Sequence, residues 1–314
     1  MELITSLDRI TRPYKNAVIT IGNFDGVHIG HQALFQEVVA KADEMNGTAI
    51  AMTFDPHPLR VIKHNKTLSL ITLREQKLEL ISASGIDVLI CVPFTCEFAD
   101  MSARSFVEDL LVKRIGVKAI IAGEDYTFGK NREGNIDLLK SYGQELGFEV
   151  VVSMWIQTAA SGESDRISST RIRKLVAEGR VDDAQKLMGR FYQVRGTVVS
   201  GRDRGGKLLG FPTANIVFQE ELCPKAGVYA VTVECFDRKF MGVANIGYSP
   251  TFSDHIFTVE IHILDFHNDI YGKKIRVNFV QRIRDEIKFS GISELSAQIR
   301  KDIAAARKIL SQVV

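Results

Sequence analysis

Residues 22–31 read Gly-Asn-Phe-Asp-Gly-Val-His-Ile-Gly-His and directly follow the apolar run Ala17–Ile21. A short run rich in β-branched residues predicts a buried strand. The Asp-Gly pair inside residues 22–31 is typical of a turn, and an amphipathic pattern follows from His31 to Asn46. The stretch therefore predicts a strand, a turn and a helix, which together form the repeating unit of a parallel α/β sheet.

The same alternation of short apolar runs and helical patterns continues through the first half of the chain. Further strands are expected at Ala49–Phe54, Asp87–Pro93, Ala119–Ala122 and Glu149–Met154, and further helices at Thr72–Ser84, Ser102–Ile115, Ile136–Leu146 and within Ser169–Met188. Strands that alternate with helices of this length indicate an open α/β sheet, whose ligands bind at the carboxyl ends of its strands.

From Tyr192 onward the pattern changes to strands separated by turns that contain Gly or Pro. The strand-like segments are Gln193–Ser200, Gly227–Cys235, Phe240–Ile246, Thr258–Asp265 and Lys274–Phe279. They predict a compact antiparallel barrel or sandwich, and the helical spacing of apolar residues in Glu294–Leu310 predicts a C-terminal helix packed against it. We therefore expect two domains, residues 1–187 and 188–314.

Composition and length exclude several classes of function. The 314 residues suit two domains, and the 40 Lys plus Arg nearly balance the 38 Asp plus Glu, so no electrostatic binding of nucleic acid is expected. No apolar run approaches the roughly 20 residues that span a membrane, and no targeting signal opens the sequence, so we expect a cytoplasmic protein. The four cysteines lack metal-site spacing and are expected to be buried free thiols.

The two histidines of the opening stretch, His28 and His31, allow two interpretations. An HxxH pair could be half of a zinc site, but catalytic zinc usually needs a third protein ligand, and paired histidines on a helix are usually four residues apart. Gly30 also argues against a position inside a helix. At a strand-turn-helix junction the backbone N–H groups and the positive end of the helix favour anions, so we expect the pair to meet a polyphosphate.

A second candidate for anion binding is the segment Ile167–Arg173. Its hydroxyl side chains could simply cap a helix, which is common. The same hydroxyls of Ser168 and Thr170, with Arg173 one turn later, could instead hold a pyrophosphate. Two loops that follow predicted strands, Thr53–Pro58 and Gly123–Gly129, are placed where such a sheet carries its substrate loops.

Taken together and in this order, the four segments GNFDGVHIGH, TFDPHP, GEDYTFG and ISSTRIR resemble the adenylyltransferase module of the bacterial bifunctional riboflavin kinase/FMN adenylyltransferase family, also called FAD synthetases. The resemblance implies a Rossmann-like nucleotidyltransferase domain. It also implies that the phosphate of FMN attacks the α-phosphate of ATP, which releases pyrophosphate and makes FAD.

The same resemblance implies roles for individual residues. His28 and His31 would bind the ATP phosphates and stabilise the transition state, and a magnesium ion would bridge the phosphates. The other implied contacts are Asn23 and Asp25 beside the nucleotide, Asp125 near the FMN phosphate, and Ser168, Thr170 and Arg173 on the β and γ phosphates.

A glycine-rich stretch in the second half, residues 201–215, is the other candidate for phosphate binding. Taken alone, a loop of Gly and Arg is more often a flexible hairpin followed by a proline turn, and this stretch lacks the Walker A pattern. Its glycines would nevertheless allow backbone N–H groups to approach phosphates, and Thr213 and Asn215 offer oxygen ligands for a metal.

This stretch, with residues 224–230, 244–252, 258–260 and 282–289, is similar to the riboflavin kinase module of the same family. The resemblance implies a six-stranded barrel in which Thr213 and Asn215 hold Mg-ATP and Glu260 is the general base for the riboflavin 5'-hydroxyl. Taken alone, Glu260 could also be an ordinary outward residue of a strand. Further implied contacts are Gly205 and Lys207 with ATP, and Arg284 and Glu286 with the flavin.

One departure from the family pattern leaves alternatives open. The loop has Arg202 where many bacterial members have Asp, and it is one residue longer. The leading hypothesis is an enzyme that phosphorylates riboflavin to FMN and adenylylates FMN to FAD; the alternative is an FAD synthetase whose kinase domain is weak or inactive. Less favoured are a regulatory flavin- or RNA-binding barrel and an adenylyltransferase for another acceptor. Small molecules are the expected partners, and self-association is possible.

Overall fold

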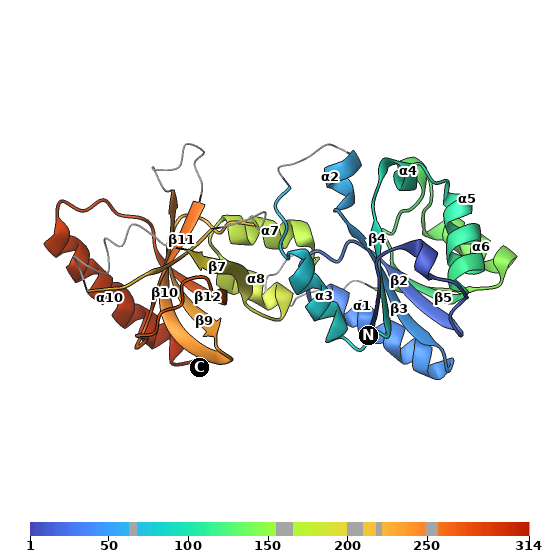
Figure 1. The fold of residues 1–314 in the computed structure, drawn as a ribbon. Helices are drawn as coiled ribbons and strands as arrows, with labels where there is room; N and C mark the ends of the chain where they lie inside the picture. The colour runs from blue at the N-terminus through green and yellow to red at the C-terminus, as the bar shows by residue number, and fades with distance from the viewer. Residues whose placement is uncertain (63–67, 155–165, 200–209, 218–221, 249–256, 314) are drawn as a thin grey trace. The chain divides into compact units, whose positions relative to one another are not determined.

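The computed structural model describes residues 1–62, 68–154, 166–199, 210–217, 222–248 and 257–313 (Figure 1). The chain forms two compact units. The first unit comprises Met1–Leu68 and Thr72–Ser168, and the second comprises Ser69–Ile71 and Ser169–Val314. The functional boundary expected after residue 187 stays a prediction.

The first unit is built on a sheet of six parallel strands, as the sequence predicts. The strands are β1 (Glu2–Ile4), β2 (Ala17–Ile21), β3 (Thr48–Asp55), β4 (Val88–Pro93), β5 (Val117–Gly123) and β6 (Glu149–Ser153), in the order β1-β4-β3-β2-β5-β6. All their pairings are parallel. From β2 the chain winds towards β4 on one side, and β5 and β6 lie on the other, so the direction of winding changes between β2 and β5. In sheets of this kind ligands bind at that point, beyond the carboxyl ends of the strands.

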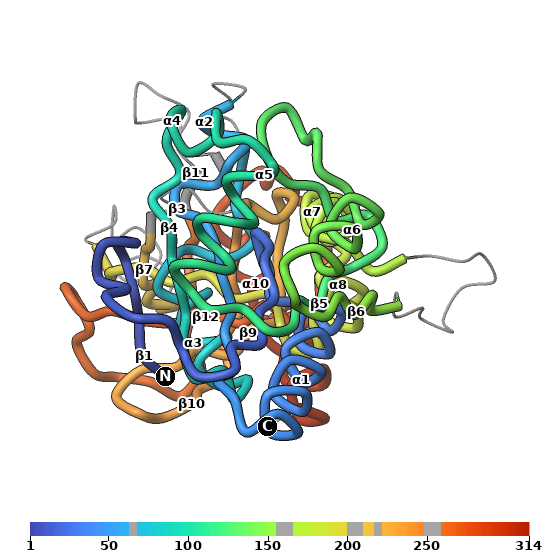
Figure 2. The backbone as a smooth tube through the Cα atoms, turned by 90° about the vertical axis from the view of Figure 1, so that its right-hand side faces the viewer, coloured from blue at the N-terminus to red at the C-terminus, as the bar shows by residue number. Residues whose placement is uncertain are grey.

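Helices cover both faces of this sheet. The main ones are α1 (Ile29–Glu44), α3 (Arg74–Ser82), α5 (Ala103–Ser105) continuing into the π-helix η2 (Phe106–Ile115), and α6 (Ile136–Leu146). Short helices η1 (Leu7–Arg9), α2 (Pro58–Ile62), α4 (Cys96–Ala99) and η3 (Lys130–Arg132) lie in the connections. Figure 2 views the first unit from the side of α5 and α6, which lie in front of the sheet.

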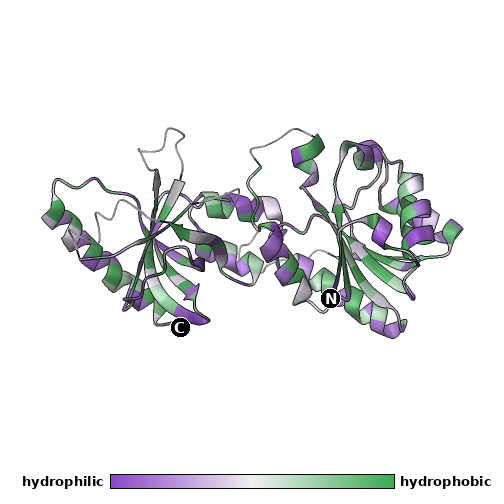
Figure 3. Ribbon diagram, viewed as in Figure 1, coloured by the Kyte–Doolittle hydropathy of each residue, from purple (hydrophilic) through white to green (hydrophobic). Residues whose placement is uncertain are grey.

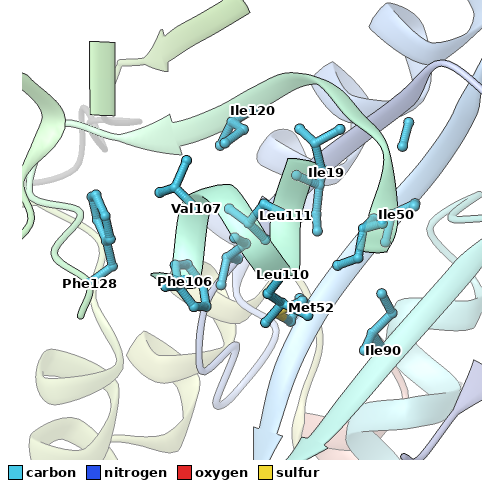
Figure 4. Packing of buried hydrophobic residues seen from close by; sticks show 14 of the residues in the cluster. Ile19, Ile50, Met52, Ile90, Phe106, Val107, Leu110, Leu111, Ile120 and Phe128 are labelled. Carbon is cyan, nitrogen blue, oxygen red and sulfur yellow. The ribbon is translucent and has the colours of Figure 1, made fainter. Parts of the chain in front are cut away.

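The alternation of side chains along the strands explains how both faces are filled. Val18 packs with Phe35 of α1 on one face, while the next residue, Ile19, packs with Val107 and Leu111 of η2 on the other. Figure 4 shows this second cluster, and Figure 3 shows the apolar strands beneath helices of mixed polarity. Strands buried on both faces read as continuous apolar runs, which is why the sequence reveals them.

The second unit is a closed antiparallel barrel, which confirms the barrel rather than the sandwich. Its strands are β7 (Tyr192–Val199), β8 (Ala214–Val217), β9 (Gly227–Cys235), β10 (Arg238–Tyr248), β11 (Phe257–Ile263) and β12 (Lys274–Arg284), in the order β10-β11-β8-β7-β12-β9. The helices α7 (Ser169–Ala177), α8 (Val181–Met188) and α10 (Ile292–Leu310) complete the unit. The expected C-terminal helix is therefore present, and its Ala306 and Leu310 pack with Ala230 and Val280 of the barrel.

The interior of the barrel is filled by side chains. Tyr192, Val231, Val277 and Phe279 are completely buried, and the ring of Tyr229 meets that of Phe279 edge to face at 5.3 Å. A small barrel packed in this way has no room for a ligand inside. Any binding site of the second unit must therefore use the outer surface or the ends of the strands.

Two further features bear on the expectations from the sequence: the state of the cysteines and the length of the apolar helices. All four cysteines are free thiols, and Cys91 and Cys235 are buried, but Cys223 is only partly covered and Cys96 is exposed. The expectation of burial was wrong for Cys96 because this residue begins the short surface helix α4, which Thr95 caps. Within the described residues, none of the helices is both long and apolar enough to cross a membrane.

Candidate active sites

The loop between β2 and α1 has an unusual backbone. Phe24, Gly26 and Val27 have φ angles of +46°, +86° and +35°, a region that only glycine adopts readily. For Phe24 and the β-branched Val27 such angles cost of order 1–3 kcal/mol each. The surrounding contacts hold a strained turn in place at the sheet edge where ligands are expected.

The two histidines of this loop pack against each other. His28 is the N-cap of α1, its Nδ1 accepts a hydrogen bond of 3.3 Å from the backbone N–H of His31, and the two rings stack with centroids 3.5 Å apart. A Cβ at Gly30 would lie only 3.2 Å from His28 Nδ1, so glycine allows the imidazole to pack against the helix start. The rings of Phe24 and His31 meet edge to face, with centroids 5.3 Å apart.

The structure does not support the zinc interpretation of this pair. Within the described ranges, no group of three or more His, Cys, Asp or Glu side chains could hold a metal ion. The pair instead lies at the N-terminus of a 16-residue helix, where the partial positive charge and free N–H groups suit a phosphate.

Asp25 stabilises the loop itself. Its Oδ1 accepts hydrogen bonds from the backbone N–H of Thr72 at 3.1 Å and from the Thr72 hydroxyl at 3.3 Å, and that hydroxyl accepts the N–H of Gly26 at 3.0 Å. Because Asp25 is buried, these contacts give it a structural role, and its contact with the nucleotide stays a prediction. Thr72 was missed as a partner because 47 positions separate it from Asp25 in the sequence.

A buried lysine lies beneath the same loop. Lys77 of α3 donates hydrogen bonds to the carbonyl of Asn23, the hydroxyl of Thr53 and the carbonyl of Phe54. The side chain of Asn23 itself is exposed. The only available signal for Lys77 was a charge within a helical pattern, which normally indicates a solvated face.

Asp125 follows β5, the strand next to β2, and therefore belongs to the same edge of the sheet. Its carboxylate forms an ion pair with Arg166. One residue later, the Tyr126 ring stacks on Phe128 at 5.6 Å, and burial raises the pKa of Tyr126 above its ordinary value. These rings pack against the core of the first unit, and the FMN contact of Asp125 stays a prediction.

The second predicted anion-binding group lies at the start of α7. Ser168 directly precedes this helix, Thr170 is exposed in its first turn, and Arg173 Nε donates to the carbonyl of Ser69 at 3.2 Å. Ser168 belongs to the first unit and the other two to the second. Their joint action on one ligand therefore stays a prediction.

In the second unit the structure places three polar side chains in register on adjacent strands. Glu260 of β11 pairs with Asn215 of β8 on one side and with Asn245 of β10 on the other. Their neighbours Ile216 and Val259 are completely buried in the interior, so the polar row lies on the outer surface of the barrel. Two of its members were predicted; Asn245 was not, although the resemblance includes its segment.

Thr213 lies next to this row. It directly precedes β8, two residues before Asn215, and both residues are half-buried. Two residues beyond Glu260, His262 Nδ1 lies 2.8 Å from the carbonyl of Pro212, which fixes the start of β8 to β11. The predicted ATP contacts Gly205 and Lys207, and also Arg202, lie outside the described residues.

The two predicted flavin contacts have different surroundings. Arg284 forms a bidentate ion pair with Asp302 of α10, with Nη2–Oδ2 at 2.7 Å, and the Asp302 side chain is only 4% exposed. Glu286 is exposed, and its Oε1 would lie 2.5 Å from a Cβ at Gly247 of β10. Arg284 thus anchors the segment after β12 to α10, while Glu286 lies against the strand that carries Asn245.

Two known family models match the chain, one in each half. Residues 11–171 match the family model described as FAD synthetase, and residues 188–310 match that described as riboflavin kinase. Each model matches the half of the chain whose motifs resemble the corresponding module of the family.

Individual relatives extend over the whole chain. Proteins named bifunctional riboflavin kinase/FMN adenylyltransferase are 39% identical in Escherichia coli, covering 98% of this chain and 97% of the relative, and 40% identical in Listeria monocytogenes, covering 95% and 94%. A crystal structure from Streptococcus pneumoniae, titled a macrolide-efflux protein, is 32% identical with a TM-score of 0.87, covering 97% of this chain and 98% of that chain. Both resemblances drawn from the sequence are confirmed: the chain belongs to the bifunctional riboflavin kinase/FMN adenylyltransferase family, the transferases that make FAD by way of FMN.

Proposed function

We propose that the chain performs the two reactions of its family at two separate sites. Residues 1–187 would transfer the adenylyl group of ATP to FMN, and residues 188–314 would transfer the γ-phosphoryl group of ATP to riboflavin. The observation that carries the first assignment is the stacked pair His28 and His31 at the start of α1. The row of Asn215, Glu260 and Asn245 supports the second.

In adenylyl transfer an oxygen of the FMN phosphate attacks the α-phosphorus of ATP, and the bond to the bridging oxygen of pyrophosphate breaks. The reaction needs alignment and charge stabilisation more than covalent participation of the protein. His28 and His31 would stabilise the charge that develops on the α-phosphate. Asn23 would contact the nucleotide, Asp125 would face the FMN phosphate, and Ser168, Thr170 and Arg173 would hold the leaving pyrophosphate.

In the kinase reaction the oxygen of the riboflavin 5'-hydroxyl attacks the γ-phosphorus of ATP, the bond from that phosphorus to the bridging oxygen of ADP breaks, and the hydroxyl loses its proton. Glu260 is placed on an accessible outer surface with amide side chains on both adjacent strands. A carboxylate in that position can accept the proton as a general base. Arg284, Glu286, Gly205 and Lys207 remain further proposed contacts with flavin and ATP.

Magnesium fits the donor types of the kinase row. The hydroxyl of Thr213 and the amide oxygen of Asn215 are oxygen donors, and Mg²⁺ is usually held by few protein ligands together with substrate phosphates. A bound ion would neutralise phosphate charge during transfer. Thr213 and Asn215 would hold the ion and help to position the phosphates of ATP.

Product analysis tests this proposal. The protein is incubated with Mg-ATP and either riboflavin or FMN, and the flavins are separated by chromatography. We expect FMN and then FAD from riboflavin, and FAD alone from FMN. If FMN is converted to FAD but riboflavin yields no FMN, the protein has only the adenylyltransferase activity. If neither FMN nor FAD is formed, the proposal is overturned. Cytoplasmic location belongs to the same proposal and is tested by cell fractionation.

A further inference from the structure

Lys77 is a buried ammonium group that the two proposed reactions do not use directly. It lies in the first turn of α3, and only 9% of the residue is exposed. Its Nζ donates three hydrogen bonds, to Asn23 O at 3.4 Å, Thr53 Oγ1 at 3.2 Å and Phe54 O at 3.3 Å. All three acceptors are uncharged oxygens, so among the residues that the structure describes no direct ion pair accounts for its burial.

Holding a charge at this place is unfavourable. Burial lowers the pKa of Lys77, and Arg74 acts in the same direction, while Cys91, Asp25 and Asp55 partly oppose the shift. A cation in the first turn of a helix also opposes the helix dipole. A methionine or leucine would fill the same volume without these costs, so the ammonium must contribute through the oxygens that it binds.

Those oxygens belong to the ends of the two central strands. Asn23 follows β2 within the histidine loop, and Thr53 and Phe54 lie at the end of β3. The carbonyl of Asn23 accepts from both the Thr53 hydroxyl, at 3.1 Å, and Lys77. Two donors on one carbonyl fix the orientation of the peptide between Asn23 and Phe24.

That orientation determines where the strained turn presents its N–H groups. In a trans peptide the N–H points opposite to the C=O, so the N–H of Phe24 points away from Lys77. Phe24 itself has the unfavourable φ of +46°. The hydrogen bonds from Lys77 and Thr53 therefore hold the first peptide of a turn that ends at His28, the N-cap of α1.

We propose that Lys77 is a positioning residue for adenylyl transfer, because its ammonium fixes the Asn23–Phe24 peptide and thereby the loop that carries His28. The proposal rests on the proposed role of His28 at the ATP phosphates. It concerns the geometry of the loop, and Lys77 itself touches neither substrate. Loss of the ammonium should therefore reduce turnover more than binding of the acceptor.

The test compares Lys77→Met with two other variants of the full chain. Lys77→Met keeps the length of the side chain and removes the charge and the donors. Thr53→Val removes the second donor to Asn23 O with almost no change in volume. Lys113→Met is the control for loss of a lysine; Lys113 is exposed and pairs with Glu108 and Asp109 in η2. Circular dichroism gives the folded fraction of each variant.

We expect Lys77→Met to lower kcat for FAD formation from FMN at least tenfold per folded molecule, with KM for FMN within twofold of wild type. Thr53→Val should lower kcat three- to tenfold, and Lys113→Met should leave it unchanged. If Lys77→Met does not fold, the kcat of Thr53→Val decides whether the proposal holds. A kcat within twofold of wild type in the deciding variant overturns the proposal. If His28→Ala retains wild-type turnover, the proposed role of His28 has failed instead.

Discussion

The candidate phosphate sites of the two units are built on different kinds of scaffold. In the first, one contiguous loop at the end of β2 carries the stacked histidines at a helix N-terminus. In the second, Asn215, Asn245 and Glu260 come from three strands that are neighbours only in the closed barrel. The first candidate site would use backbone N–H groups of a strained turn, whereas the second would use side chains on the outer surface of the barrel.

This difference predicts that the two activities can be removed separately, and the largest effect is expected in the first unit. His28→Ala removes a cap of α1 and a proposed phosphate ligand, so FAD formation from FMN should fall about 10³-fold. Phosphorylation of riboflavin should stay within twofold. Steady-state assays of both reactions check this, with His267→Ala, which changes an exposed histidine outside the helices and strands, as control.

The converse variant is Glu260→Gln. It keeps the shape of the side chain but cannot accept the proton, so riboflavin phosphorylation should fall at least about 10²-fold. Adenylylation of added FMN should be unaffected. The matched control is Glu149→Gln, an exposed glutamate of strand β6. Equal kinase rates in the Glu260 variant and its control would contradict the assignment of the base.

An effect of intermediate size, on stability, is expected in the second unit. Asp302→Ala leaves the Arg284 guanidinium without its buried carboxylate partner. Because the Arg284 side chain is 17% exposed, water can compensate in part, and we expect a loss of about 2 kcal/mol in the free energy of unfolding. Urea denaturation monitored by circular dichroism measures it. A change below about 0.5 kcal/mol would show that this ion pair does not anchor the segment after β12.

The smallest expected effect concerns the glycine beneath the imidazole. Gly30→Ala places a methyl group 3.2 Å from His28 Nδ1 and must displace that ring by a few tenths of an ångström. We expect kcat for FAD formation to fall about tenfold with little change in stability, since alanine is the better helix former. Gly147→Ala is unsuitable as a control because its φ is +78°. Gly291→Ala, with open space around it, serves instead.

Much of the fold follows from the sequence because its elements are long and periodic. The helix Ile136–Leu146 and the strand Gly227–Cys235 have the predicted bounds. Strands β1 and β8, with three and four residues, are too short to show a period and were not predicted. The helix expected to start at Thr72 begins at Arg74, because Thr72 is bonded to Asp25.

The candidate sites were predictable where their residues are adjacent in sequence. His28 and His31 stand in one motif, whereas Lys77, Thr72 and Asp302 act through partners that only the tertiary structure brings near. Lys77 and Asp302 are charges within amphipathic helices, and sequence periodicity does not show that tertiary contacts bury them. The resemblance supplied Glu260, since an isolated carboxylate on a strand carries no functional signal by itself.

The central claim, that two independent sites perform successive steps, is tested most directly by mixing two variants that each lack one of the two activities. Glu260→Gln and His28→Ala are each given riboflavin and Mg-ATP, alone and together, and the flavins are separated by chromatography. We predict almost no product from the first, FMN without FAD from the second, and FAD from the mixture, because released FMN reaches the intact adenylyltransferase site of the first variant. FAD from His28→Ala alone, or no FAD from the mixture, would contradict the claim.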